Sequence, residues 1–127
     1  MRIEIRANVH PTENPDKIKD AIRKIFPDMN IALKEDYVMG ESSSLDSLEQ
    51  FKNKLRLQAI RNSARRVMLE SRKNNSLSFM LNRQVATVGK ISFSDGKTAL
   101  GPVIVTIESE DLDRVVDHLA PSTSGKN

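Results

Sequence analysis

Basic side chains are concentrated in one short stretch of the sequence and are its clearest candidate for contact with a ligand. Residues 52–73 contain eight Lys and Arg and one acid, Glu70, so the segment carries +7 (8 − 1), whereas the whole chain carries +3. At 100° per residue, Arg61, Arg65 and Arg72 would lie within about 40° of one another on a helix. Guanidinium groups stacked in this way can hold successive phosphates in bidentate contacts, which gives salt-sensitive binding that does not depend on base sequence. The segment therefore predicts an RNA-facing surface.

The same charges also have a simpler interpretation, in which they form a solvated face or pair with acids of this chain or of a partner chain. The C-terminal region supplies five carboxylates close to a single basic residue, Arg114. Pairing of the arginines with Glu108, Glu110 or Asp111 would favour this interpretation. Arginines that project unpaired from one surface would favour RNA binding.

A second polar group consists of Asn82, Arg83, Gln84 and Lys90, which we expect on the edge of a strand. Such side chains can contact a nucleic-acid groove, although hydrogen bonds within the fold are their commoner role. The predicted nucleic-acid-binding residues of both groups are Lys54, Arg56, Arg61, Arg65, Arg66, Arg72, Arg83 and Lys90.

No arrangement of residues indicates catalysis, a metal site or a cofactor. His10 and Glu13 have i, i+3 spacing, but Pro11 breaks the helix that would bring them together, so we expect them to cap a turn. The serines at 42–44 have no adjacent His and acid, and the chain has no cysteine. A small-molecule binder, identified by a closed apolar pocket, is a third alternative.

Aromatic residues make up only 4% of the chain. Neither an aromatic RNA-binding signature nor a Gly-X-X-Gly clamp is present. If RNA binds, phosphate and shape contacts must therefore dominate.

The composition predicts one globular domain at residues 1–120 and a flexible tail at 121–127. Of 127 residues, 38% are hydrophobic and 29% are charged, a balance typical of globular proteins. No apolar run approaches the roughly 18 residues that span a bilayer. The first residues lack the apolar block of a signal peptide, so we expect a cytoplasmic protein with no membrane partner.

Hydrophobic periodicity predicts an α+β fold with a mostly antiparallel sheet and helices packed on one face. Apolar residues alternate over 2–9, and an apolar helical stripe follows over 15–26 after a capping Asn14. The other predicted elements are a strand at 30–39, a loop at 40–44, helices at 45–55 and 57–73, strands at 77–81, 85–93 and 103–107, and a last helix capped by Ser109.

Within the basic segment, a helical projection separates a core face from a second apolar face. Leu55 and Leu69 lie away from the predicted core stripe, and either another part of the same sheet or, in a homodimer, a twin subunit would cover them. The predicted core stripe is Leu57, Ile60, Ala64, Val67 and Met68.

Several segments, in order, resemble the archaeal uncharacterised protein family number 201. They are residues 10–17 (HPTENPDK), 55–58 with 64–67 (LRLQ and ARRV), 81–93 (LNRQVATVGKISF) and 100–107 (LGPVIVTI). This family tends to carry Lys at the position of Arg83 and an aromatic at that of Thr87. The resemblance implies an α+β domain with a fold like that of the ribosomal protein that binds 5S RNA, and a homodimer. It implies no catalytic residues.

Two functions remain open. The first is a non-catalytic binding protein whose basic helix contacts RNA. The alternative is a homodimeric scaffold or regulatory protein that does not bind RNA.

Overall fold

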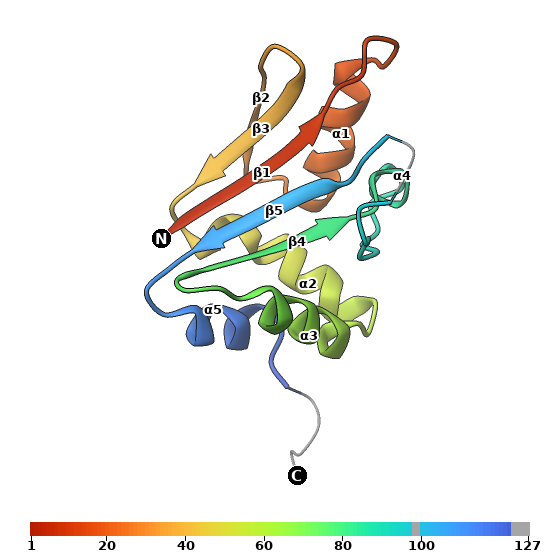
Figure 1. The fold of residues 1–127 in the computed structure, drawn as a ribbon. Helices are drawn as coiled ribbons and strands as arrows, with labels where there is room; N and C mark the ends of the chain where they lie inside the picture. The colour runs from red at the N-terminus through yellow and green to blue at the C-terminus, as the bar shows by residue number, and fades with distance from the viewer. Residues whose placement is uncertain (98–99, 123–127) are drawn as a thin grey trace.

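The computed structural model describes residues 1–97 and 100–122, which form a five-stranded antiparallel sheet with helices on one face (Figure 1). The order of the strands is β2-β3-β1-β5-β4. Their bounds are β1 Arg2–Asn8, β2 Asn30–Leu33, β3 Tyr37–Ser42, β4 Ser76–Leu81 and β5 Val103–Glu108. The predicted α+β class and the predicted mostly antiparallel sheet are confirmed.

The helices occupy the buried face of the sheet, and the other face is open. In β1, Ile3, Ile5 and Ala7 point into the core, and the residues between them lie on the open side. The helices are α1 Pro15–Ile25, a 3₁₀ turn at Leu45–Leu48, α2 Glu49–Leu57, α3 Arg61–Ser71, α4 Arg83–Ala86 and α5 Leu112–Leu119. The predicted tail lies outside the described residues from 123 onward.

The opening strand and helix form as predicted, because their signals are local. The side chain of Asn14 accepts a hydrogen bond from the Asp16 amide at 3.0 Å, which caps the N-terminus of α1. Pro15 occupies the first turn, where its missing amide hydrogen costs nothing. Ile18 and Ile22 are buried on the inner face.

The predicted single strand at 30–39 is wrong, because two strands, β2 and β3, form a hairpin there. The amide of Lys34 donates to the carbonyl of Tyr37 at 2.8 Å and closes the turn. Gly40, which the sequence placed in a loop, lies inside β3 opposite Ile31. A Cβ on Gly40 would lie 2.5 Å from Ile31 Cδ1 and 3.1 Å from the Asn30 carbonyl oxygen, so a larger residue here would force both neighbours to move.

The predicted strand at 85–93 is also wrong. The side chain of Asn82 accepts a hydrogen bond from the Val85 amide at 3.0 Å and starts the short helix α4. Gly89 then adopts φ +75°, and the chain returns so that Phe93 forms a bridge with Leu81. At the C-terminus, Asp111 and not Ser109 caps the last helix.

A row of stacked aromatic rings lies in the core between the helices and the sheet. Phe51 of α2 stacks on Phe26 and on Phe79, with ring centroids 5.3 and 5.4 Å apart. Phe79 meets Phe93 edge to face at 5.9 Å. Phe26, Phe51 and Phe79 are buried, so these three rings offer no stacking platform to a ligand, and Phe93 is partly buried.

Candidate nucleic-acid interface

The basic segment folds as two helices, α2 and α3, joined by a tight turn. Ala59 in that turn has φ +57°, and the Ile60 amide donates to the Leu55 carbonyl at 3.0 Å. The sequence predicted one helix over 57–73, but α3 begins only at Arg61, so the predicted start of this helix is wrong. Leu57, predicted to be core, is 72% exposed, and Leu55, predicted to lie away from the core, is fully buried. Leu69 is exposed, as predicted.

Arg65 of α3, and Arg72 directly after this helix, are paired with acids of α5. Arg65 Nη1 donates to Asp117 Oδ1 at 2.7 Å and to the Ala120 carbonyl at 3.2 Å. Arg72 forms an ion pair with Asp113. One of the interpretations left open by the sequence paired these arginines with acids of the C-terminal region, although it named other carboxylates of that region. Exposed pairs of this kind contribute about 0–1 kcal/mol each to stability, but they occupy the guanidinium groups.

A third polar contact ties α5 to α2. His118 Nε2 lies 2.9 Å from Glu49 Oε2. This hydrogen bond holds the pKa of Glu49 below its ordinary value. The polar contacts of α5 therefore reach both basic helices.

Four of the predicted residues make no ion pair or side-chain hydrogen bond with any other described residue: Arg56, Arg61, Arg66 and Lys90. Arg56 and Arg66 are exposed, and Arg61 is half-buried. Lys54 differs, because its ammonium donates to the Gly89 carbonyl at 2.7 Å. Among the predicted residues of α2 and α3, the cations without a side-chain partner in the described part of the chain are thus Arg56, Arg61 and Arg66, and Lys73 is exposed just beyond them.

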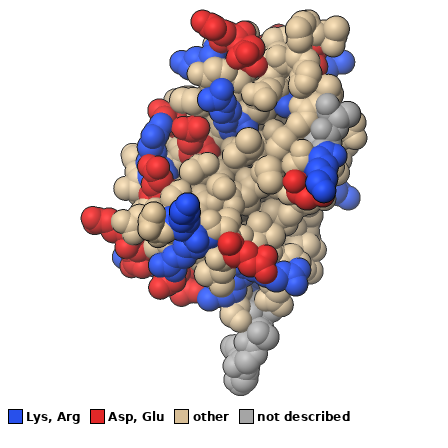
Figure 2. All heavy atoms as spheres, viewed as in Figure 1, with Lys and Arg blue, Asp and Glu red and all other residues tan. Residues whose placement is uncertain are grey.

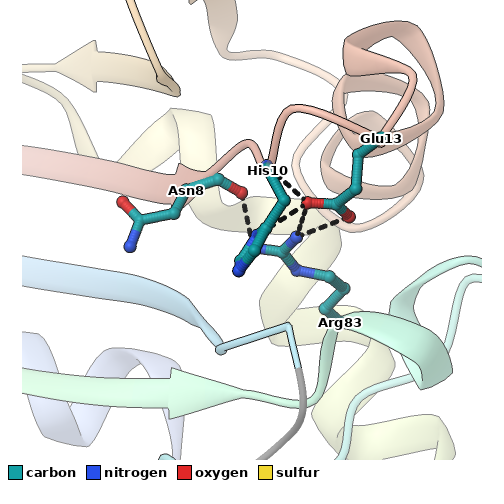
Figure 3. A network of polar contacts seen from close by, with 4 residues as sticks. All are labelled: Asn8, His10, Glu13 and Arg83. Carbon is teal, nitrogen blue, oxygen red and sulfur yellow. Dashed lines mark hydrogen bonds and ion pairs between the residues drawn. The ribbon is translucent and has the colours of Figure 1, made fainter.

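Arg83 lies in the interior, at the centre of the polar network in Figure 3. Its Nη1 donates to both carboxylate oxygens of Glu13, at 3.0 and 2.9 Å, and its Nη2 donates to the Asn8 carbonyl at 2.7 Å. Its Nε is buried without a hydrogen-bond partner among the described residues. An RNA phosphate could reach this guanidinium only by displacing Glu13, so Arg83 serves to join β1, the start of α1 and α4.

The carboxylate of Glu13 is stabilised in its charged form. Burial on its own would raise the pKa of Glu13, but the hydrogen bond from the His10 amide, at 2.8 Å, and the contacts with Arg83 outweigh it. The pKa of Glu13 therefore lies below its ordinary value. His10 Nδ1 also lies 3.1 Å from this carboxylate, so His10 and Glu13 do fix the turn, as the sequence predicts.

Side chains of α1 and α2 hold the turn after α4. Lys24 Nζ donates to the Thr87 carbonyl at 2.6 Å. The side-chain amide of Gln58 makes two hydrogen bonds with the backbone of Ile91, at 2.9 and 2.8 Å. Together with Lys54, these contacts place two ammonium groups at the turn, and neither Lys24 nor Gln58 was singled out from the sequence. Their partners lie over 30 residues away, so no local pattern signals them.

The open face of the sheet is not a basic surface. Blue and red side chains interleave over the face seen in Figure 2. Arg2 bridges Glu4 and Glu41, at 3.2 and 2.7 Å. The guanidinium of Arg6 lies 3.7 Å from the ring centroid of Tyr37. Balanced charge on this face makes it a poor match for a polyanion.

Within residues 1–97 and 100–122, no group of three or more His, Asp or Glu side chains is placed to hold a metal ion. No helix in the described part of the chain is long and apolar enough to cross a membrane.

Residues 2–110 match a family model described as RNA binding. The chain is 40% identical to a UPF0201 protein of Sulfurisphaera tokodaii, over 97% of this chain and 89% of that protein. It is also 40% identical to a UPF0200/UPF0201 protein of Archaeoglobus fulgidus, and it spans 38% of the length of that protein.

Solved structures give the same similarity. An uncharacterised UPF0201 protein, 40% identical, matches with a TM-score of 0.85 over 97% of this chain and 95% of that one. A UPF0201 protein of Methanococcus jannaschii, 31% identical, also gives 0.85, over 98% and 96% of the two chains. A DUF54 protein of Archaeoglobus fulgidus, 21% identical, gives 0.72 over 92% and 93%, a likeness of fold alone.

Proposed function

The chain belongs to the UPF0201 family of archaeal proteins, and from this premise we propose that it binds RNA, without catalysis, through phosphate contacts of its basic helices α2 and α3. The observation that carries the proposal is that three arginines on these helices, Arg56, Arg61 and Arg66, form no ion pair with any acid of the described residues. The RNA-binding description of the family model that matches residues 2–110 supports it.

The mode of binding follows from what the two helices offer. Arginine forks engage phosphate oxygens and carry no information about sequence. The described aromatic rings of the core are stacked against one another, so base stacking on them contributes nothing. For three phosphate contacts on a single strand, the logarithm of affinity should fall with the logarithm of salt with a slope of about −2.

The test is binding to structured RNA, single-stranded RNA and duplex DNA across a salt titration. The double variant Arg61→Ala/Arg66→Ala should weaken RNA binding by an order of magnitude and reduce the salt slope by about 1.4. The control, Lys19→Ala/Lys34→Ala, removes the same charge from α1 and from the β2–β3 turn and should change binding by less than about threefold. Equal weak binding of every polyanion, or equal losses in the two variants, would remove the support for an RNA site on these helices.

A homodimeric scaffold or regulatory role is the second candidate, and two observations favour it. Asp117 and Asp113 already occupy Arg65 and Arg72. Leu57 and Leu69 are 72% and 41% exposed, and a partner could cover them. The molar mass measured by light scattering, for wild type and for Leu57→Ser/Leu69→Ser, separates the candidates. A dimeric wild type and a monomeric variant, together with no RNA binding, would support the scaffold.

We also propose a cytoplasmic location, since RNA is found there and the chain has no cysteine to pair in an oxidising compartment. A fold like the ribosomal protein that binds 5S RNA stays a prediction from the sequence, and RNA binding as proposed does not depend on it.

A further inference from the structure

A cavity of about 380 Å³ lies between α1 and α4, apart from the free arginines of α2 and α3. Its walls include the N-cap Asn14 and, from α1, Lys17, Ile18 and Ala21, together with Gln84 of α4 and Leu100. The volume falls in the range of small-ligand sites, about 300–1,000 Å³. The cavity therefore has room for one organic group of moderate size.

Two larger cavities among the described residues carry the wrong charge for RNA. One, of about 650 Å³, is lined by Glu35 and Asp36 as well as Arg6. Another, of about 680 Å³, is lined by the acids Glu108 and Glu110 beside Arg2. The cavity between α1 and α4 has one acid, Glu13, which Arg83 neutralises.

The lining of this cavity combines an apolar surface with free amide groups. Ile18, Ala21 and Leu100 supply aliphatic contacts for a flat ring. The Asn14 side-chain oxygen is used to cap α1, which leaves its amide hydrogens available, and the exposed side chain of Gln84 has no partner among the described residues. Asn and Gln amides pair with the edges of nucleobases, donating and accepting at once.

Two lysines flank the cavity along α1. Lys17 lines it, and Lys24 follows seven residues later, about 10.5 Å along the helix. The Lys24 ammonium donates a hydrogen bond to the carbonyl of Thr87, and Thr87 also lines the cavity. That bond uses one of three ammonium donors and leaves two for a phosphate.

We propose that this cavity binds one unpaired nucleotide of the RNA, with its base between α1 and α4 and its flanking phosphates on Lys17 and Lys24. The inference rests on the proposed function and adds to it a site where base identity can be recognised. The Arg83–Glu13 pair fixes the wall that joins α1 to α4, so little ordering is needed on binding.

The experiment uses the full chain and two probes. The first probe is a set of four short single-stranded RNAs that differ only in the central base. Wild type should prefer one base by about fivefold or more, as expected for one amide–base pair. The variant Asn14→Ser/Gln84→Ala keeps a capping side chain on α1 but loses both amides, so its preference should shrink to within about twofold with the salt slope unchanged.

Two further variants are measured with the same four RNAs. Lys17→Ala should weaken all four RNAs equally and reduce the salt slope by about 0.7. Gln50→Ala, which removes an exposed amide from α2, should leave the base preference intact. Thermal unfolding of each variant confirms that it is folded. An unchanged base preference in Asn14→Ser/Gln84→Ala would overturn the inference.

The second probe separates this inference from the proposed function. Titration with the four 5′-nucleoside monophosphates, against ribose 5-phosphate, should shift the backbone amide resonances of Ala21, Gln84 and Thr87 for one nucleotide most. Shifts there in a protein that binds no RNA would support the cavity while the basic-helix proposal fails. RNA binding that depends on Arg61 and Arg66, without such shifts, would overturn the cavity and leave that proposal standing.

Discussion

Arg65 Nη1 lies 2.7 Å from Asp117 Oδ1, a contact that joins α3 to α5 across 52 residues of sequence. With the pair of Arg72 and Asp113, it places acidic side chains on two of the arginines that the sequence predicted to contact RNA phosphates. The family model matches residues 2–110, so both acids lie beyond the matched segment. The carboxylates of α5 would thus compete with RNA phosphates for Arg65 and Arg72, two of the residues predicted to bind RNA.

The double variant Asp113→Asn/Asp117→Asn should bind RNA several-fold more tightly than wild type, because it frees two guanidinium groups for phosphate contacts. The salt slope should steepen by about 1.4, which a salt titration measures. Asp28→Asn/Asp36→Asn makes the same change in net charge on other surface positions and serves as the control. Equal gains in both variants would mean that net charge alone is responsible.

Loss of the Arg83 guanidinium should strongly destabilise the protein. Arg83→Met leaves the half-buried Glu13 carboxylate without its arginine partner, and breaking a pair whose arginine is buried costs up to about 3–5 kcal/mol. Urea unfolding measures the difference in the free energy of unfolding. Arg56→Met, a matched change at an exposed position, should alter it by less than about 0.5 kcal/mol. A small change in the free energy of unfolding of Arg83→Met would show that the Arg83–Glu13 pair does not stabilise the fold.

Stability should fall on acidification partly through Glu13. Its pKa is depressed in the folded protein, so its contribution is present above the unfolded value of about 4.5 and is lost as the pH falls through the lower folded value. Urea unfolding between pH 3 and 7 should show a decline in wild type below about pH 4.5. In Glu13→Gln the free energy of unfolding should decline less steeply, because the contribution of the Glu13 carboxylate is absent and only the other carboxylates are protonated. Identical slopes in the two proteins would contradict the depressed pKa.

Ala59→Gly should stabilise the protein slightly. Ala59 has φ +57°, a region that costs a non-glycine residue about 1–2 kcal/mol, and the flexibility of glycine in the unfolded chain offsets part of the gain. We expect a net gain of about 0.5 kcal/mol in urea unfolding. Ala32→Gly, at an exposed strand position, should destabilise instead. A loss of stability in Ala59→Gly would indicate that its methyl group makes a contact that outweighs the strain.

The sequence predicted those parts of the fold whose signals are local. Alternation over β1 and the Asn14–Pro15 start of α1 involve neighbours a few residues apart, and both formed as expected. At 81–93, the alternation of apolar residues predicted a strand, but the side chain of Asn82 caps a short helix there instead. The sequence placed a break in the basic segment between 55 and 57, and the structure has it between Leu57 and Arg61, where neither glycine nor proline marks the position.

The candidate site was predictable in composition but not in detail. The concentration of positive charge and the acidic C-terminal region are both visible in the sequence, and α3 does meet α5 through them. Arg83 and Glu13 are 70 residues apart, so their pairing depends on tertiary structure that periodicity cannot supply. The cavity beside them is equally a product of how α1 packs against α4.

The central position of β1 and β5 in the sheet has a consequence for synthesis of the chain. β1 begins at Arg2, yet one of its two neighbours, β5, ends at Glu108, and the edge strand β4 pairs with β5 alone among the described strands. A nascent chain that lacks residues 103–108 therefore exposes an unpaired edge of β1 and leaves β4 without a ladder. Such long-range pairing is slow to form, so the sheet closes only after residues 103–108 have been synthesised, and until then the unpaired edge of β1 is exposed to aggregation.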